Sequence, residues 1–505
     1  MSSDDATKTE TKGGEEGTLL GMLIGLSVLS AALLVRQSAT PGAITFAGIT
    51  VDRLGAALTL LVAAIGAVTF RFSMRYMDGD PGRRRFLRLL ALAIGSAYLL
   101  MLATDLRLLI AAWSLTSFAL HRLLIFYPDR VEAWRPARKK FLISRLGDVA
   151  LISGATLVWW VWGTFDLHTF LRGVADGGGG PAETAVGLLV VIAALTKSAQ
   201  FPFHSWLPET MESPTPVSAL MHAGIINAGG VLLLRFAPLI VRVPEALFLL
   251  ALVGSVTACL GTLAMWAQVK VKRTLAWSTV GQMGFMMVQC GLGAFPVAAL
   301  HIVGHGCYKA WSFLRSGDLP PSWSPPAVTS PGRTLAMAAI GTGACIPALW
   351  LASRLTGFAP WHSPGEWSLS AVVALSLGQV WVALFRASTA HVGDRAARVA
   401  VALLTTLAAS VAIAALYRGA ALFLEPVLGD LPAPTGPIAW ASATLPVLAL
   451  AALCVIHATL PTFGRTSAGR AFRVHALHGF YFGAVADRLV DRLWPRALPS
   501  EVKHA

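Results

Sequence analysis

Residues 195–234, LTKSAQFPFHSWLPETMESPTPVSALMHAGIINAGGVLLL, decide how this chain folds. Lys197 stands in one apolar run and His222 stands in the next, and between them the helical pattern is interrupted by Pro202, Pro208, Pro214 and Pro216. Each proline removes a backbone donor and clashes with the preceding turn. In lipid, such a break survives only where protein or a water-filled cavity satisfies the freed backbone groups. An ionisable residue beside the break therefore predicts an ion or proton path.

The composition is that of a membrane protein. Of the 505 residues, 55% are hydrophobic and only 13% are charged, and the mean hydropathy is +0.65. Soluble domains are about 25% charged. Apolar runs of about 20 residues, long enough to cross a bilayer, recur along the whole chain. The five cysteines form no CxxC pair, so we expect no zinc site, iron–sulfur cluster or other cofactor in this chain.

We predict an all-α polytopic membrane protein with about fourteen transmembrane helices. The expected spans are 18–35, 51–70, 86–103, 105–126, 141–163, 184–207, 214–236, 246–268, 274–292, 295–314, 334–354, 368–386, 398–418 and 438–461. Basic residues cluster in the loops after even-numbered spans, so these loops lie on one side. The positive-inside rule makes that side the cytoplasm, with both termini there. Topology therefore explains the net charge of +14 better than nucleic-acid binding does.

An internal echo indicates two inverted repeats. The sixth span contains TKSAQFP (196–202), and the eleventh contains GTGACIP (341–347). A displacement of five spans places the second copy upside down in the membrane. Broken helices at matching positions of two inverted halves are typical of a transport site. We therefore expect two inverted five-helix repeats, each with a broken helix.

The tenth span places three ionisable side chains on one helix face. In HIVGHGCYK (301–309), His301, His305 and Lys309 recur at spacings of four. Because imidazole titrates near neutral pH, this row suits a proton relay, and we interpret Lys197 and His222 in the same way. The alternatives are polar packing between helices and a zinc site, although no third ligand lies close in sequence.

Further charged residues lie near the ends of spans. Arg145 and Asp148 can pair at i,i+3, either as an interfacial salt bridge or as part of conduction. Glu209 and Glu212, at the break, could admit protons or pair with Lys139 or Lys140. The segment 470–495 mixes leucines, aromatics and charges at helical spacing, and it suits the membrane surface or a partner. No catalytic triad, Walker loop or dinucleotide fingerprint is present, so we expect no catalytic site.

The stretch 195–234 resembles the antiporter-like, proton-conducting subunits of respiratory complex I, Mrp antiporters and membrane-bound hydrogenases. HIVGHGCYKAWSFLRSGD (301–318) and VKRTLAWSTVGQMGF (271–285) resemble the subunit-5 branch of complex I. The resemblance implies two inverted five-helix units and a relay through Lys197, His222, His301, His305 and Lys309. Two features depart from the family pattern. Ser114 stands after Trp113, where a glutamate is usual, and the next cation after Pro347 is Arg354 instead of a nearby lysine.

The resemblance also divides the chain into six parts. We expect a disordered cytoplasmic tail (1–17), N-terminal transmembrane helices (18–83), a first antiporter-like repeat (84–240) and a second (241–396). C-terminal transmembrane helices (397–462) and a basic amphipathic cytoplasmic tail (463–505) follow.

The segment HALHGFYFGAVADRLVDRL (475–493) is similar to the membrane subunits of bacterial DAB inorganic-carbon accumulation complexes. This resemblance implies an inner-membrane subunit that passes a cation, chiefly H+, down its gradient. A large soluble, zinc-containing, carbonic-anhydrase-like partner on the cytoplasmic face then converts CO2 to bicarbonate, so the zinc belongs to the partner. The alternative is a proton- or sodium-translocating subunit of a respiratory, hydrogenase or Mrp-type complex. A third reading is a scaffold that conducts nothing.

Overall fold

The computed structural model describes residues 3–40, 42–177, 180–317, 330–359, 361–387 and 395–494, and these residues are almost entirely helical. One antiparallel hairpin, β1 (Ile44–Phe46) and β2 (Ile49–Val51), follows the first helix. The α-helices up to the break are α1 (Ser3–Ala39), α2 (Arg53–Tyr76), α3 (Arg83–Leu102), α4 (Leu106–Leu124), α5 (Val131–Trp162), α6 (Leu167–Ala175) and α7 (Pro181–Lys197).

Short helical pieces follow α7, and long helices then resume. The pieces are α8 (Trp206–Glu209), η1 (Thr210–Glu212), α9 (Thr215–Ala223), η2 (Ile225–Asn227), α10 (Ala228–Arg235) and α11 (Ala237–Ile240). The long helices are α12 (Pro244–Ala267), α13 (Val271–Gly291), α14 (Phe295–Leu314), α15 (Pro331–Thr356), α16 (Pro364–Ala387), α17 (Arg395–Leu428) and α18 (Gly436–Phe463). The chain ends with α19 (Ser467–Leu477), η3 (Gly479–Tyr481) and α20 (Phe482–Leu493).

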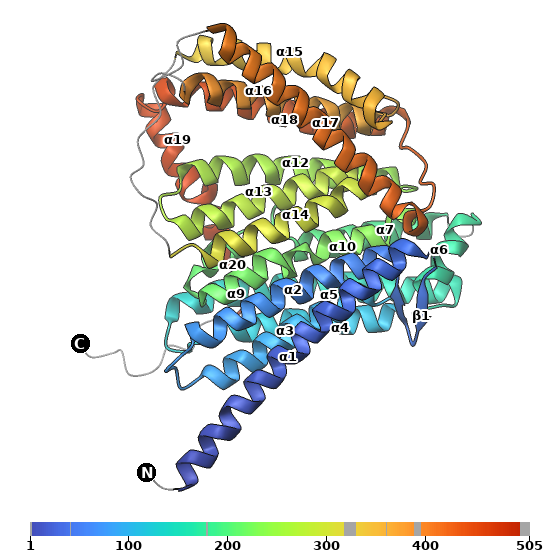
Figure 1. Cartoon of the computed structure of the whole chain (residues 1–505), viewed down its shortest axis with the longest axis vertical. Coiled ribbons are helices and arrows are strands. Elements are labelled where there is room, and N and C mark those ends of the chain that lie inside the picture. The colour runs from blue at the N-terminus through green and yellow to red at the C-terminus, as the bar shows by residue number, and fades with distance from the viewer. Residues whose placement is uncertain are drawn as a thin grey trace.

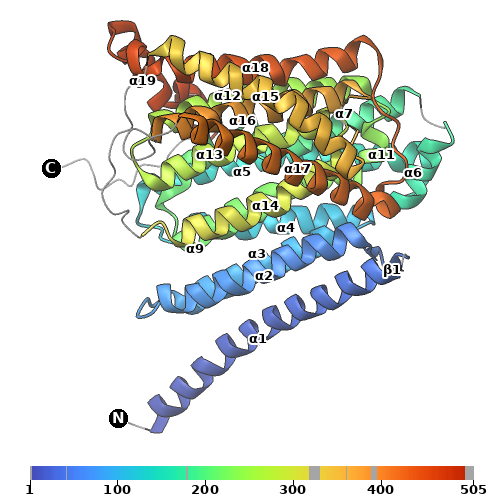
Figure 2. The same ribbon diagram turned by 45° about the horizontal axis from the view of Figure 1, so that its top comes forward.

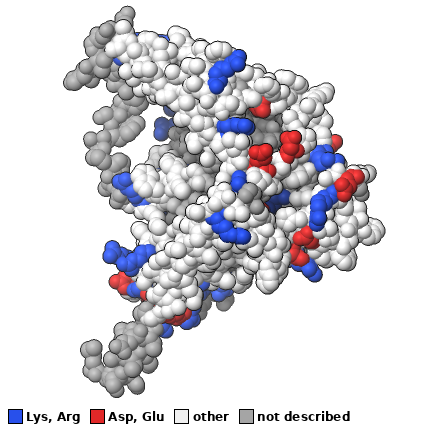
Figure 3. Space-filling model, turned by 45° about the vertical axis from the view of Figure 1, so that its right-hand side comes forward, with Lys and Arg blue, Asp and Glu red and all other residues white. Residues whose placement is uncertain are grey.

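The long helices lie roughly side by side in stacked layers. Figure 1 shows α15 to α18 at the top, α12 to α14 below them, and α2 to α5 lower still. Figure 2 shows α1 along the outer edge, beyond α2 and α3. Figure 3 shows charged side chains in small clusters, with broad areas of the visible face carrying none. This arrangement is the one expected of helices whose apolar sides face lipid.

The membrane character predicted from the sequence is confirmed. Among the described residues, ten helical segments are long and apolar enough to cross a membrane. Every predicted span coincides with a helix or with a run of helical pieces, and the four spans outside those ten fall on α4, α7, α13 and α14. The count of fourteen and the division into repeats stay predictions.

The break between the two halves of residues 195–234 is present. Helix α7 ends at Lys197, and α9 does not begin until Thr215. The second break, expected at Pro347, was wrong, because α15 continues as one helix from Pro331 to Thr356. The physical difference is the number of prolines. A single interior proline costs one hydrogen bond and can be accommodated, whereas four prolines within fifteen residues leave only short helical pieces.

The N-terminal tail differs from expectation. Residues 14–17, within the tail predicted to be disordered, lie in α1, and Glu15 and Glu16 pair with Arg88 and Arg83 at 2.7 Å. The segment from α19 to α20 packs on one side against this chain, and its contact with the membrane surface or a partner stays a prediction. There Gln268 donates to the Leu477 carbonyl at 3.1 Å. Most of the Pro-rich loop 317–332 lies outside the described residues.

Candidate functional site

Lys197 is the last residue of α7, and its ammonium group points into the protein. The side chain is buried, and Nζ donates to the Trp113 carbonyl at 3.0 Å and to Ser117 Oγ at 2.8 Å. The amine also lies 4.4 Å from the centre of the Trp113 ring. Helix α4 thus supplies neutral oxygens and an aromatic face, both of which accept a cation in low dielectric.

The carboxylate that interacts electrostatically with Lys197 belongs to α5 and not to α4. Asp148 is buried, pairs with Arg145 at 2.7 Å, and interacts electrostatically with Lys140 and Lys197. Gly147 lets α5 and α7 approach each other, because a Cβ at this position would collide with the hydroxyl of Thr196 on α7. The expected Arg145–Asp148 pair therefore exists, and it lies beside the break instead of in isolation at an interface.

A second group of ionisable side chains forms where α9 meets α14. His222 is fully buried and stacks on Phe313, with ring centroids 4.4 Å apart. Lys309 is equally buried and donates to the Leu275 carbonyl at 2.9 Å. His305, one turn earlier, interacts electrostatically with both of them. Within the described part of the chain, neither ring nitrogen of His222 or His305 has a hydrogen-bond partner.

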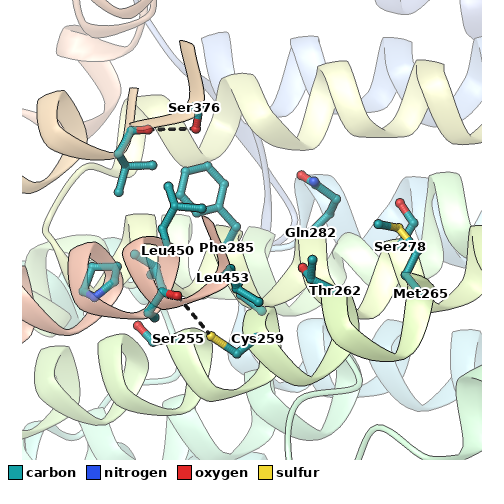
Figure 4. A pocket seen from close by; sticks show the side chains of 16 residues that line it. Ser255, Cys259, Thr262, Met265, Ser278, Gln282, Phe285, Ser376, Leu450 and Leu453 are labelled. Carbon is teal, nitrogen blue, oxygen red and sulfur yellow. Dashed lines mark hydrogen bonds between the residues drawn. The ribbon is translucent and has the colours of Figure 1, made fainter. Parts of the chain in front are cut away.

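His301 extends this second group towards a cavity. Its ring lies 5.9 Å from that of His305, and Nδ1 is 2.9 Å from Gln289 Oε1. A cavity of about 480 Å3 is lined by both histidines together with residues of α13, α14 and α17. A neighbouring cavity of about 300 Å3, between α12, α13, α16 and α18, shares Ser278, Gln282 and Phe285 with it (Figure 4). The imidazole of His305, whose ring nitrogens have no partner among the described residues, therefore lines a cavity with room for water.

A charged cluster closes the end of the bundle where α5 begins. Lys139 is buried and holds two carboxylates, Glu209 of α8 and Asp487 of α20, each at 2.8 Å. The predicted pairing of Glu209 with Lys139 is therefore confirmed. Burial raises the pKa of Glu209, and the Lys139 ammonium opposes that shift. Glu212 is exposed, and its backbone carbonyl accepts from Arg130 at 3.0 Å.

The structure gathers the predicted relay residues into two groups instead of one row. Lys197 belongs to the group around Ser117 and Asp148, whereas His222, His301, His305 and Lys309 form the other. Among the described residues, no hydrogen bond or ion pair joins a side chain of one group to the other. Ser198, the residue after Lys197, donates from Oγ to the Ile226 carbonyl at 2.8 Å, and this bond joins the end of α7 to the segment after α9.

Sequence reasoning missed the burial of three charged side chains. Asp52 is buried and ion-paired with Arg235, which also donates to the Met101 carbonyl at 2.9 Å. Lys140 is buried against α4. Its place immediately before the fifth apolar run was the one available signal. In the described residues, no three His, Cys, Asp or Glu side chains group closely enough to hold a metal ion.

Comparison with known families identifies the fold. Residues 103–321 match the family described as NADH:quinone oxidoreductase/Mrp antiporter, TM, and residues 44–87 match complex I chain 5 N-terminus. Together the matches cover just over half of the chain. The chain belongs to the antiporter-like membrane subunits. Lys197, His222, His301, His305 and Lys309 all fall within the antiporter-like match.

The relatives of this antiporter-like subunit point in two functional directions. It is 44% identical over 277 residues to the probable inorganic carbon transporter subunit DabB1 of Halothiobacillus neapolitanus, covering 53% of this chain and 49% of that one. It is 37% identical over 273 residues to NADH-quinone oxidoreductase subunit L of Mycobacterium tuberculosis, covering 54% and 43%. The chain therefore spans about half the length of the curated relatives it matches.

A solved structure supports the same fold over more of the chain. A chain of respiratory complex I from Thermus thermophilus with bound aureothin superposes with a TM-score of 0.51 at 25% identity. The match covers 88% of this antiporter-like subunit and 94% of the other chain.

Proposed function

We propose that this chain is a cation-conducting membrane subunit that passes protons down their gradient to energise inorganic-carbon uptake. Lys197 and the α14 row then act as relay groups, with Glu209 at the end where protons enter. The subunit lies in a bacterial inner membrane with both termini in the cytoplasm. It works with a large soluble, zinc-containing, carbonic-anhydrase-like partner, which makes bicarbonate from CO2.

The observation that carries the proposal is the buried amine of Lys197 at the end of a broken helix. Its described hydrogen bonds go to two neutral oxygens, and the nearby Asp148 is shared with Arg145. An amine buried in this way exchanges its proton more readily than one locked in a full ion pair. Ionisable groups of this kind inside a membrane protein mark ion and proton paths.

The assignment to inorganic-carbon uptake rests on the relatives. An inorganic-carbon transporter subunit shares 44% identity with this chain over 277 residues. Every proposed relay residue falls within the antiporter-like family match. The C-terminal resemblance to DAB membrane subunits supports the same assignment. The zinc partner follows from that resemblance, since a chain that only moves a cation needs another subunit to act on CO2.

Two experiments test the proposal together. The tagged full-length chain is purified from its native membrane, and the bound proteins are identified. We expect one large zinc-containing protein, and recovery of flavin or iron–sulfur subunits would overturn the assignment. In parallel, deletion of the gene should abolish growth in air and permit it at elevated CO2. Lys197→Met should not rescue the deletion strain, whereas the exposed control Lys270→Met should rescue it fully.

The second candidate is a proton- or sodium-translocating subunit of a respiratory, hydrogenase or Mrp-type complex. The 37% identity to NADH-quinone oxidoreductase subunit L favours it. It predicts that deletion lowers sodium tolerance or quinone-linked respiration and leaves growth in air unchanged. The growth comparison above therefore separates the two candidates.

A further inference from the structure

Two adjacent lysines at the start of α5 serve different neighbours. Lys139 turns towards the break and the C-terminal segment, where it pairs with Glu209 and Asp487. Lys140 turns towards α4, is 4% exposed, and donates from Nζ to the Ser117 carbonyl at 2.5 Å. Helical geometry explains the difference, since successive residues point about 100° apart around the axis.

Ser117 contacts a second amine as well. Its hydroxyl accepts from Lys197 Nζ at 2.8 Å, so one residue of α4 binds the side chains of two lysines from α5 and α7. Both lysines are buried, with 4% and 8% of their surfaces exposed. A buried, unpaired lysine is costly, and two that share one neutral residue need a reason.

The charges around the pair do not balance it. The titratable groups that face the two amines are Arg145 and Asp148 on α5 and His121 on α4. Asp148, the one carboxylate in this set, already pairs with Arg145 at 2.7 Å. Two ammonium groups this close in a low-dielectric interior repel each other strongly. The pair therefore favours the state in which one amine is protonated and the other is neutral.

We propose that Lys140 and Lys197 form a coupled pair that passes protons along the path, with Ser117 holding the two amines in register. The pair rests on the proposed function and adds a residue to it. When the Lys197 ammonium gives up its proton towards His222, it becomes a neutral amine. The repulsion on Lys140 then disappears, and Lys140 accepts a proton from the side of Lys139 and Glu209. That proton passes on to Lys197 and restores the starting state.

Proton flux into liposomes tests the pair. The full-length chain, with its co-purifying subunits, is reconstituted, and flux driven by a pH gradient is followed with a trapped pH-sensitive dye. Lys140→Met and Lys140→Arg should each lower flux at least about tenfold, because methionine carries no proton and a guanidinium does not release one. Lys270→Met, an exposed lysine at the start of α13, should match the wild type.

The pH profile of the residual flux separates coupling from a structural role. Removing a neighbouring positive charge lets Lys197 keep its proton to higher pH, so Lys140→Met should raise the pH of half-maximal flux by about one unit. A permanent charge has the opposite effect, so Lys140→Arg should lower it. Wild-type flux and profile in Lys140→Arg would overturn the pair, since Lys140 would then serve only as a donor that holds α4.

A third variant covers the case in which both Lys140 variants fail to fold, as judged by gel filtration in detergent. Ser117→Ala keeps the carbonyl that binds Lys140 and removes the hydroxyl that binds Lys197. The pair predicts several-fold lower flux, and unchanged flux would overturn it. Lys197→Met isolates the underlying proposal. If that change leaves flux intact, the proposed path fails as a whole. If it abolishes flux while the Lys140 and Ser117 variants behave as wild type, only the pair fails.

Discussion

The helices before and after residue 320 differ in whether they bury charged side chains. Among the residues from α1 to α14 whose burial the structure describes, eleven charged or histidine side chains are buried: Glu16, Asp52, Lys139, Lys140, Asp148, Lys197, His204, His222, Arg235, His305 and Lys309. In the described part of α15 to α18, the buried polar side chains are the hydroxyls of serine and threonine, such as Ser370 and Thr406. Arg354, the cation that follows Pro347, is exposed and lies over Trp350.

The difference follows the broken helix. Where α7 stops, neighbouring helices offer carbonyl and hydroxyl oxygens to Lys197, and the break leaves space for Glu209 to reach Lys139. Helix α15 runs without interruption through Pro347, so it opens no space of this kind. A buried charge needs both space and acceptors, and in the described part of α15 to α18 no charged side chain is buried.

The largest effect is expected from neutralising Lys197. Lys197→Met should lower proton flux in liposomes at least about a hundredfold, because the relay loses its group at the break. Arg354→Met, the matched change in α15, should leave flux within about twofold of the wild type. Equal losses of flux in both variants would show that both sets of helices conduct protons. That result would contradict the difference between the two sets.

Placing a charge in the second set should cost stability. Cys345 is fully buried in α15, where its thiol contacts the Gly341 and Ala374 carbonyls. Cys345→Lys leaves an unpaired ammonium there and should destabilise the protein by about 3–5 kcal/mol, as thermal unfolding in detergent would show.

Cys345→Val is the control for this substitution, because it changes volume without adding charge. A Cys345→Lys protein with wild-type stability would mean that α15 already has room for a hydrated cation. Protein stability would then not be the reason why the described part of α15 buries no charged side chain.

A smaller gain is expected from removing the proline of α15. Pro347→Ala restores a backbone donor in a helix that is already continuous, so stability should rise by about 1 kcal/mol with flux unchanged. Pro446→Ala in α18, also inside an unbroken helix, is the matched control. A loss of flux in Pro347→Ala would indicate that α15 opens at this residue during transport.

The smallest effect concerns Glu209. Burial raises its pKa in the folded protein, so ionising it opposes folding. The contribution of this carboxyl to stability is therefore greatest below its ordinary pKa and falls as pH rises through the raised value. Glu209→Gln should remove this weak dependence, by less than about 1 kcal/mol, in melting curves recorded from pH 4 to 8. Identical pH dependence in both proteins would contradict the shift.

How far the sequence could lead depended on the kind of signal. The break at residues 195–234 was predictable, because four prolines act locally on the helix that contains them. Residues at spacings of four, His301, His305 and Lys309, were predictable as one face for the same reason. The break at Pro347 was mispredicted, since whether one proline interrupts a helix depends on packing that a seven-residue echo does not contain.

Contacts between distant segments were beyond local reasoning. Asp52 and Arg235 are 183 positions apart, and no periodicity links them, so their buried ion pair could not be predicted. The same holds for Lys140, whose partner on α4 lies 23 positions earlier. Helix periodicity tells which way a side chain points on its own helix. It does not identify the residue of another segment that the side chain contacts.

The double grip of Lys139 has a mechanical consequence. One ammonium ties α8, at the broken helix, to α20, near the end of the described chain, while Phe482 of α20 packs against His204 at the same place, with ring centroids 5.9 Å apart. Pulling α20 away leaves Lys139 with a single counter-ion and exposes a buried imidazole. Whatever holds or releases α20 therefore also sets the charge balance around Lys139 and Glu209.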